Sequence, residues 1–114
     1  MDNCIFCKII RGEIPSTKVY ENDKVYAFRD INPEAPVHIL VVPKQHVANI
    51  LEGVAFGNNM MVDLTEAIAE IAKQEGIDKT GFRVVSNCGK DACQSVEHLH
   101  FHVLGGEQLS TRMA

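Results

Sequence analysis

The stretch Glu97-His98-Leu99-His100-Phe101-His102-Val103-Leu104-Gly105-Gly106 places three of the five histidines of the chain at every second position. Side chains at alternate positions of a β-strand point to one face, whereas a helix would spread these imidazoles over about 200° of arc. The pattern therefore predicts a strand whose histidine face is exposed to solvent and chemically reactive. Its alternate residues, Leu99, Phe101 and Val103, form an apolar side that can enter a core.

Three imidazoles on one face can bind a metal, transfer protons or attack a phosphorus atom. His100 is the best nucleophile candidate because imidazoles flank it on both sides, provided that an acceptor holds its other ring nitrogen. Asn87, Gln94 and Ser95 are polar groups just upstream that can stabilise charge on phosphate oxygens. A histidine-rich metal site is the alternative, but positions roughly 6.5–7 Å apart do not favour all three ligands on one ion.

Cys4 and Cys7 have the Cys-x-x-Cys spacing of metal knuckles and of redox motifs. The redox interpretation expects the pair to open a helix in a βαβ unit, whereas this pair precedes a turn and a hairpin. A closed structural zinc site needs four ligands. The candidates for the other two are His38, His46, His98, Cys88 and Cys93. Two cysteines that are merely packed or free remain the third possibility.

Length and composition predict one domain over residues 1–114, with 46% hydrophobic residues to build a core. The net charge of −4, without a basic run, argues against binding to a nucleic-acid polymer. No apolar run approaches the length of a membrane span, so no membrane association is expected. The first residues lack the pattern of a signal peptide, and we therefore expect a cytoplasmic protein with cysteines that are reduced or metal-bound.

The periodicity of the chain predicts an α+β fold. Strands are expected at residues 19–20, 25–28, 38–42 and 82–86 and at the histidine stretch, forming a mostly antiparallel sheet of about five strands. One long helix is expected from Asn58 to Glu75, together with a short helix. Asn58 or Asn59 can cap the long helix and Gly76 can end it. Its apolar stripe, formed by Met61, Leu64, Ile68 and Ile71, predicts either a core contact or a dimer face.

The segment from His98 to Leu104 resembles the His-φ-His-φ-His-φ-φ signature of the histidine triad (HIT) superfamily, where φ is an apolar residue. Residues 27–46, Gln94-Ser95-Val96 and Gly105-Gly106 are similar to its Hint branch, the histidine triad nucleotide-binding proteins. The resemblance covers nearly the whole chain. It implies a HIT fold, a homodimer whose sheets continue across the interface, and purine nucleotide substrates. It also implies hydrolysis or transfer at the α-phosphate through a nucleotidyl-histidine intermediate.

The resemblance also implies a role for particular residues. His100 matches the nucleophile. The other matching positions contact the nucleotide or pack beside the triad: His102, Asn87 and Ser95 at the phosphate, Asp30 at the ribose, Ile31 in the nucleoside pocket, and His38 next to the triad. Gln94, in the segment similar to the Hint branch, is expected among the nucleotide-binding residues. In members with an N-terminal cysteine pair, a structural zinc is bound by positions that are here Cys4, Cys7, His46 and His98. Catalysis then needs no cofactor.

Two positions depart from the Hint pattern. Cys93 stands where the branch usually has glycine, and the chain ends soon after the triad, without the aromatic and proline segment of longer tails. The function expected is that of a phosphoramidase-like nucleotide hydrolase. The alternatives are a dinucleoside polyphosphate hydrolase and a zinc-stabilised nucleotide-binding or scaffold module with little turnover.

Overall fold

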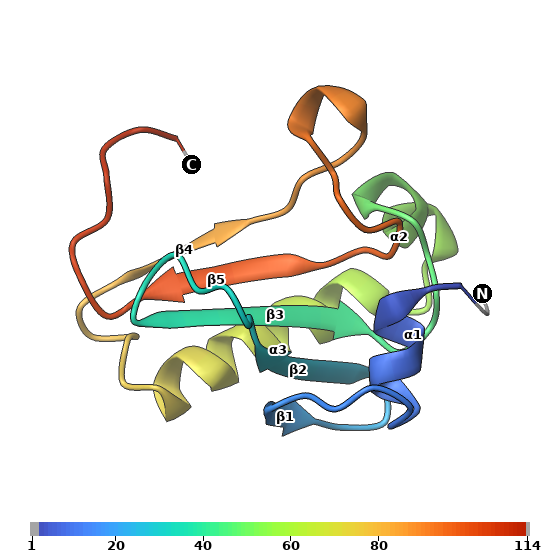
Figure 1. Cartoon of the computed structure of the whole chain (residues 1–114), viewed down its shortest axis with the longest axis horizontal. Helices are drawn as coiled ribbons and strands as arrows, with labels where there is room; N and C mark the ends of the chain where they lie inside the picture. The colour runs from blue at the N-terminus through green and yellow to red at the C-terminus, as the bar shows by residue number, and fades with distance from the viewer. Residues whose placement is uncertain (1–2, 114) are drawn as a thin grey trace.

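The computed structural model describes residues 3–113, which form a five-stranded antiparallel sheet with helices on both of its faces (Figure 1). The strands lie in the order β1-β2-β3-β5-β4. The strand bounds are β1 Lys18–Glu21, β2 Val25–Arg29, β3 Val37–Pro43, β4 Phe82–Val85 and β5 Phe101–Gly105. The helices are α1 Ile5–Ile10, α2 Ile50–Phe56, α3 Met60–Gln74 and the 3-10 turn η1 Lys90–Ala92. The predicted α+β class is confirmed.

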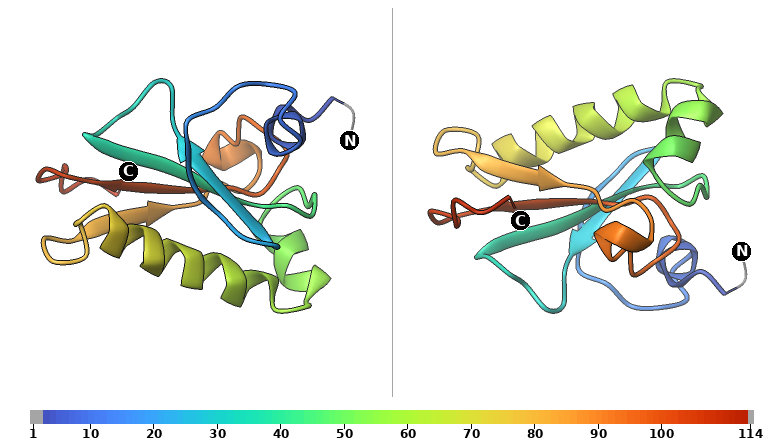
Figure 2. Two further views of the ribbon diagram at one scale, coloured as in Figure 1. Left: turned by 90° about the horizontal axis from the view of Figure 1, so that it is seen from below. Right: turned by 90° about the horizontal axis from the view of Figure 1, so that it is seen from above.

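The sheet separates two apolar clusters, because α3 covers one face and α1 lies on the other (Figure 2). The larger cluster joins α3 to the inward residues of the central strands, which include Val25, Ile39, Val41 and Val103. The smaller cluster lies under α1 and consists of Phe6, Ile9, Tyr26, Phe28, Leu40 and Val42. Within the described residues, no helix is both long and apolar enough to cross a bilayer.

The apolar stripe of α3 belongs to the core of its own chain. Leu64 is fully buried and Ile68 is only 6% exposed, and both pack in the larger cluster. The core contact, one of the two roles predicted for the stripe, is therefore present. Gly76 ends α3 as predicted, with φ of +75°, a conformation that costs glycine little. At the other end, Asn59 makes no side-chain capping bond.

Two short α-helices are present where the sequence predicts one. In α2, a Cβ atom at Gly53 would lie 2.9 Å from the Leu99 side chain, so glycine is needed for the helix to pack this closely on the residues before β5. Glycine within a helix is unfavourable by about 1 kcal/mol relative to alanine. The residue that allows this packing therefore weakens the helical pattern of the segment.

The histidine stretch differs from its predicted form in two ways. Strand β5 begins only at Phe101, so His98 and His100 lie in the extended segment before it. A hydrogen bond to the segment that follows β3 holds these residues, since the Leu99 amide donates to the Val47 carbonyl. The histidine face is also largely shielded from solvent, because His98 is fully buried and His100 is 4% exposed. Only His102 is partly open to solvent.

Candidate active site

His100 is held in one tautomer by the main chain. Its Nδ1 lies 2.8 Å from the carbonyl oxygen of His98, which can only accept, so Nδ1 carries the proton and donates. Nε2 of the neutral ring therefore keeps a free lone pair. The His100 carbonyl in turn accepts from the Ser86 hydroxyl at 2.9 Å. The acceptor that a nucleophilic imidazole requires is thus supplied by a residue two positions earlier.

His38 and His102, called here the histidine pair, form a directed hydrogen-bond chain. The main-chain amide of Glu34 donates to His38 Nδ1 at 3.0 Å, which places the His38 proton on Nε2. That Nε2 donates to His102 Nδ1 at 2.9 Å and also lies 3.4 Å from Asp30 Oδ2. Since His102 accepts at Nδ1, its own proton is on Nε2. The chain of bonds thus leaves His102 with an N–H to donate.

His102 is uncharged at neutral pH. Burial, together with the neighbouring His100 and His38, lowers the pKa of His102 to about 4, although the Asp30 carboxylate acts in the opposite direction. The ring of His100 lies beside it, with 5.1 Å between the ring centroids. Neighbouring imidazoles therefore present different groups: a lone pair on His100 and an N–H on His102.

Asp30 and Ile31 lie in the turn between β2 and β3, next to the histidine pair. Asp30 Oδ1 accepts from the main-chain amide of Asn32 at 2.8 Å, and this bond orients the carboxylate. Ile31 is 91% exposed. The structure therefore brings the predicted ribose residue close to the triad and leaves the predicted nucleoside residue uncovered.

The loop before β5 contains the predicted phosphate contacts. The Asn87 amide and the Ser95 hydroxyl make no hydrogen bond within residues 3–113 and are free to bind a ligand. Gln94 is different, because it donates both amide hydrogens to main-chain carbonyls and accepts from the amide of Gly89. Its side chain holds the loop together. Cys93 has φ of +59°, a left-handed conformation that explains why glycine suits this position.

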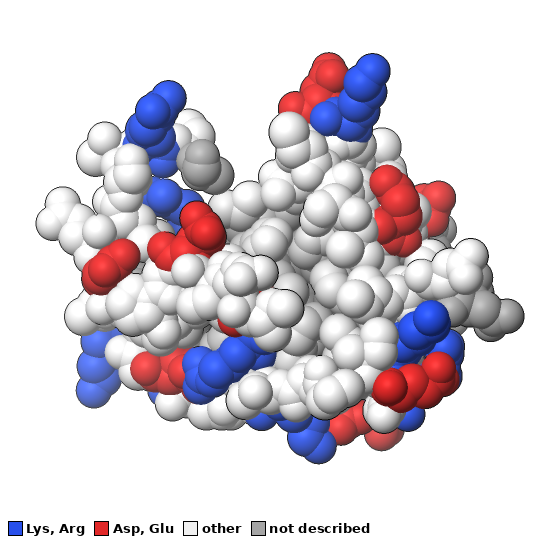
Figure 3. Space-filling view, in the orientation of Figure 1, with Lys and Arg blue, Asp and Glu red and all other residues white. Residues whose placement is uncertain are grey.

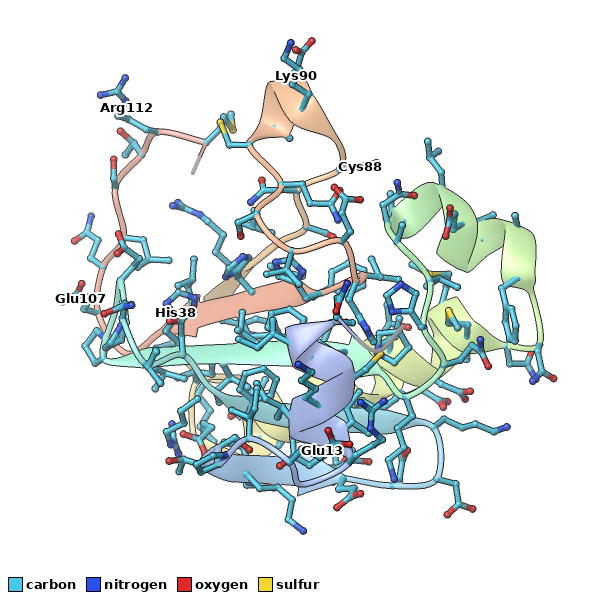
Figure 4. The ribbon with its side chains drawn as sticks, turned by 45° about the vertical axis from the view of Figure 1, so that its right-hand side comes forward. Glu13, His38, Cys88, Lys90, Glu107 and Arg112 are labelled. Atoms are coloured by element: carbon cyan, nitrogen blue, oxygen red, sulfur yellow. The ribbon has the colours of Figure 1, made fainter. Side chains whose placement is uncertain are left out.

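Two projections stand above β5, and the surface is hollowed between them (Figure 3). One is the loop with η1, which carries Lys90, and the other is the C-terminal segment, which carries Arg112 (Figure 4). The Arg83 side chain of β4 holds the C-terminal segment by donating to the Ser110 carbonyl at 2.7 Å. Each projection therefore carries an exposed cation, and on the η1 loop the exposed Asp91 carboxylate stands next to it.

Four sulfur and nitrogen donors meet on the other side of His98, in what we call the cysteine–histidine cluster: Cys4, Cys7, His46 and His98. Cys4 Sγ lies 3.3 Å from His98 Nδ1, and Cys7 Sγ lies 3.3 Å from His46 Nδ1 and 3.5 Å from His98 Nδ1. All four donor atoms are within 4.8 Å of one another. Among the candidate ligands, Cys88 and Cys93 do not belong to this cluster.

The cluster fits a tetrahedral zinc ion. Zinc bonds of about 2.3 Å to sulfur and 2.0–2.1 Å to nitrogen imply sulfur–nitrogen separations of about 3.5 Å. His98 Nε2 donates to the Pro43 carbonyl at 2.8 Å, so the Nδ1 lone pair faces the thiols. Burial lowers the pKa of His98 to about 4, which keeps the ring neutral, as a ligand must be. Burial and the Cys4 thiol raise the pKa of Cys7 to about 11, and a bound cation would favour the thiolate.

Comparison with known protein families identifies the class of this protein. The HIT domain model matches residues 11–109, and the chain belongs to the HIT family. A histidine triad protein from Clostridium difficile has a TM-score of 0.91 and 53% sequence identity, over 97% of this chain and 96% of its own. A HIT family hydrolase from Clostridium thermocellum has a TM-score of 0.94 and 44% identity, over 100% and 99% of the two chains. The resemblance seen in the sequence is confirmed.

Three curated relatives narrow the range of functions. A "14 kDa zinc-binding protein" of Zea mays is 51% identical over 110 residues, which cover 93% of this chain and 84% of the relative. "Adenylylsulfatase HINT1" of Arabidopsis thaliana is 48% identical over 110 residues, 93% and 73% of the two chains. "Purine nucleoside phosphoramidase" of Escherichia coli K12 is 42% identical over 113 residues, 99% and 95%. The family similarity thus supports a nucleotide hydrolase-like function.

Sequence reasoning missed the groups that orient the predicted residues. The carbonyls of Pro43 and His98 and the amide of Glu34 are main-chain atoms, and no side-chain pattern reveals them. Phe6 was also missed, although it lies between the two cysteines and packs edge-on against His100, with 5.1 Å between ring centroids. The sequence signal that could have indicated Phe6 was the presence of a large apolar residue between the two cysteines of a predicted metal site.

Proposed function

We propose that this protein is a hydrolase or transferase that acts at the α-phosphate of purine nucleotides, with phosphoramidates as the preferred substrate class. The observation that carries the proposal is the pairing of tautomers: a free Nε2 lone pair on His100 beside an Nε2–H on His102. Attack on phosphorus needs the first group, and the charge that develops on phosphate oxygens needs a donor such as the second.

The proposed reaction proceeds in two displacements. His100 Nε2 forms a bond to the α-phosphorus as the bond from phosphorus to the leaving nitrogen or oxygen breaks. Water then attacks the nucleotidyl-His100 intermediate, which releases the nucleoside monophosphate and regenerates the imidazole. Over both steps, water supplies a hydroxyl to the phosphate and a proton to the leaving group. Metal ions take no part in this scheme.

The remaining site residues bind the nucleotide. Asp30 accepts from the ribose hydroxyls, Ile31 covers the nucleoside, and Asn87 and Ser95 donate to the phosphate. The free donors of Asn87 and Ser95 and the exposed side chain of Ile31 support these assignments. Gln94 contributes through the loop that it holds, and His38 through the bond that orients His102.

Steady-state rates over a small substrate panel test the proposal. The panel contains an adenosine and a guanosine phosphoramidate, an adenylyl ester, adenylyl sulfate and a diadenosine polyphosphate. We expect the highest kcat/KM on a phosphoramidate. A preference for the diadenosine compound would favour a dinucleoside polyphosphate hydrolase. Tight nucleoside monophosphate binding without turnover on any substrate would favour a binding or scaffold module.

We further propose a structural zinc in the cysteine–histidine cluster. A set of two thiolates and two imidazoles has no open position for water, so such an ion stabilises the fold and does not catalyse. The support is the donor geometry of the cluster and the name of the maize relative. Plasma emission spectrometry on protein purified without chelator or metal resin should find one zinc per chain, and a value near zero would refute the site.

We also propose a homodimer, formed through the edge strand β4. Phe82 and Val84 are 39% and 42% exposed on a strand that has a neighbour on one side only. An uncovered apolar edge favours pairing with another strand. Light scattering at micromolar concentration should give twice the chain mass, and Val84→Glu should give a monomer. Leu51→Glu, which changes an exposed leucine of α2, is the control and should remain dimeric.

A further inference from the structure

A hollow outside the histidine sites lies where the junction of α2 and α3 meets the β1–β2 turn and the end of β3 (Figure 2). Its volume is about 340 Å³, within the range of about 300–1,000 Å³ that is typical of ligand pockets. Met60, which is 6% exposed, and the fully buried Leu64 form its apolar floor. The hollow therefore offers a binding place for an apolar side chain.

A second, more open hollow continues the first one along α3. The two share Asp23, Lys24 and Asp63 in their linings, and the second extends to Glu66 with a volume of about 370 Å³. We call the combined depression the α3 groove. It runs from Phe56, the last residue of α2, to the second turn of α3, and its elongated form suits a short peptide segment.

Negative charge exceeds positive charge around the α3 groove. Within residues 3–113, the carboxylates of Asp23, Asp63 and Glu66 form no ion pair. Lys44 is held at 2.8 Å by a carboxylate of β1, whereas the Lys24 ammonium has no such partner among these residues. Three unpaired carboxylates and one unpaired ammonium make the rim acidic. A basic partner is therefore electrostatically complementary to it.

The turn before α3 keeps an aromatic side chain at the mouth of the groove. Gly57, Asn58 and Asn59 have positive φ angles of 70°, 53° and 61°, and two successive non-glycine residues in this conformation are uncommon. Phe56 is 45% exposed and belongs to neither apolar cluster. The Asn58 amide makes no hydrogen bond within the described residues. The turn therefore presents an uncovered ring and a free amide to a molecule in the groove.

The neighbouring edge strand β1 is unsuited to pairing with a further strand. Its register with β2 is interrupted at Val19, and such a bulge disrupts the ladder. The Val19 carbonyl also already accepts from the Gln74 side chain of α3 at 3.0 Å. A molecule in the α3 groove therefore binds through side chains, and not by adding a strand to the sheet.

We propose that the α3 groove is a docking site for a segment of a partner protein in which an apolar anchor residue is flanked by lysine or arginine. The anchor enters the hollow over Met60 and Leu64, and Phe56 lies beside it. The flanking cations lie near Asp63 and Glu66. Methionine adapts its shape, so Met60 accepts anchors of different form. Because the groove is separate from the histidine sites, the proposal does not depend on the proposed function.

Nuclear magnetic resonance with short synthetic peptides tests the docking site. Each peptide is rich in lysine and has leucine, isoleucine, phenylalanine or methionine at its centre, and matched peptides have glutamate in place of lysine. We expect a lysine-rich peptide to shift the amide signals of Phe56, Met60 and Asp63, with little change at His100. The affinity should fall as salt is added, because the rim charges are exposed. No binding by any lysine-rich peptide, or equal binding of the glutamate peptides, would overturn the proposal.

Two matched pairs of variants identify the surface. Phe56→Ala removes the aromatic wall, whereas Leu51→Ala removes an exposed leucine of the same helix that lies outside the groove. Glu66→Gln removes a rim charge, whereas Glu70→Gln changes an exposed glutamate one turn further along α3. We expect roughly tenfold weaker binding for Phe56→Ala and about threefold for Glu66→Gln, with changes below about twofold in the controls. Equal losses in the controls would overturn the proposal.

The same titration distinguishes other occupants of the groove. If butylamine, a simple amine, shifted the same signals at similar concentration, the groove would be assigned to a small cation. If the signals of Phe56 and Met60 shifted with protein concentration in the absence of peptide, it would be assigned to a second copy of the chain. Either result would overturn the docking of a partner segment.

Discussion

The cysteine–histidine cluster and the histidine pair include His98 and His102, which are close in the sequence, but the ring nitrogens of the two groups differ in their hydrogen bonds. In the cysteine–histidine cluster, the Nε2 of His98 donates to a carbonyl, so its Nδ1 lone pair faces two thiols. In the histidine pair, His38 accepts from a main-chain amide, so a proton lies between the two rings. With Asp30, the pair also brings three potential metal ligands within 4.8 Å. Proximity alone therefore does not distinguish a metal site from a proton-carrying site, whereas the outer hydrogen bond does.

His100→Ala should have the largest effect, because His100 belongs to neither group and is the proposed nucleophile of the covalent step. We expect kcat to fall by roughly 10³-fold or more while nucleotide binding largely survives. Single-turnover kinetics measure the first quantity and calorimetry with AMP the second. A variant that retained a tenth of the wild-type kcat would show that another residue is the nucleophile.

Cys4→Ser should separate stability from chemistry on the cluster side of the comparison. Loss of a bound structural ion destabilises the folded state, and we expect the melting temperature to fall by more than about 10 °C. At room temperature kcat should fall much less, since His100 keeps its bond to the His98 carbonyl. Calorimetry, zinc content and kcat are measured on one preparation. Cys88→Ser, outside the cluster, is the control, and an equal loss of zinc there would refute the ligand assignment.

Asp30→Ala should affect substrate binding more than the chemical step. A carboxylate that accepts from two ribose hydroxyls contributes about 1.5–3 kcal/mol, so KM should rise by roughly 10- to 100-fold. Because these bonds are similar in the ground and transition states, kcat should change less. Asp23→Ala, an exposed carboxylate in the β1–β2 turn, serves as the control. A selective fall in kcat with KM unchanged would instead place Asp30 in the chemistry of the histidine pair.

His102→Asn should have the smallest effect, on the pH dependence of stability. The pKa of His102 is about 4 in the folded state and near 6.5 when unfolded, so the unfolded chain binds more protons between these values. This contribution to stability is fully present above pH 6.5 and is lost as pH falls toward 4. Urea unfolding at several pH values should therefore show a shallower acid loss in the variant. Parallel curves for the two proteins, at equal zinc content, would contradict the assignment.

The sequence was sufficient to predict what depends on local pattern. Alternation located the histidine stretch, and Leu99 and Val103 enter the core as expected. The burial of His100 was not predictable in this way, because it depends on contacts with residues distant in the sequence, such as Phe6. The two roles left open for the α3 stripe could not be separated for a related reason. An apolar face has the same sequence pattern whether its own sheet or a second chain covers it.

The ligands of the proposed metal site were likewise predictable from local sequence only in part. Spacing identified Cys4 and Cys7, but five residues remained as candidates for the other two ligands, and only the family resemblance selected His46 and His98. The structure brings these four together. No local signal could do so, since His46 follows β3 and His98 precedes β5. The antiparallel pairing of these strands brings the two histidines near each other.

The bond from the Glu34 amide to His38 has a consequence for how this site tolerates mutation. The direction of the histidine pair is set by a main-chain N–H, which every residue except proline provides. Position 34 can therefore change its side chain freely without reversing the proton arrangement, as long as the turn keeps its path. Pro33 and Pro36 stiffen that turn on either side. The orientation of the proposed donor His102 thus depends on the path of the backbone, and comparison of side chains alone would not detect it.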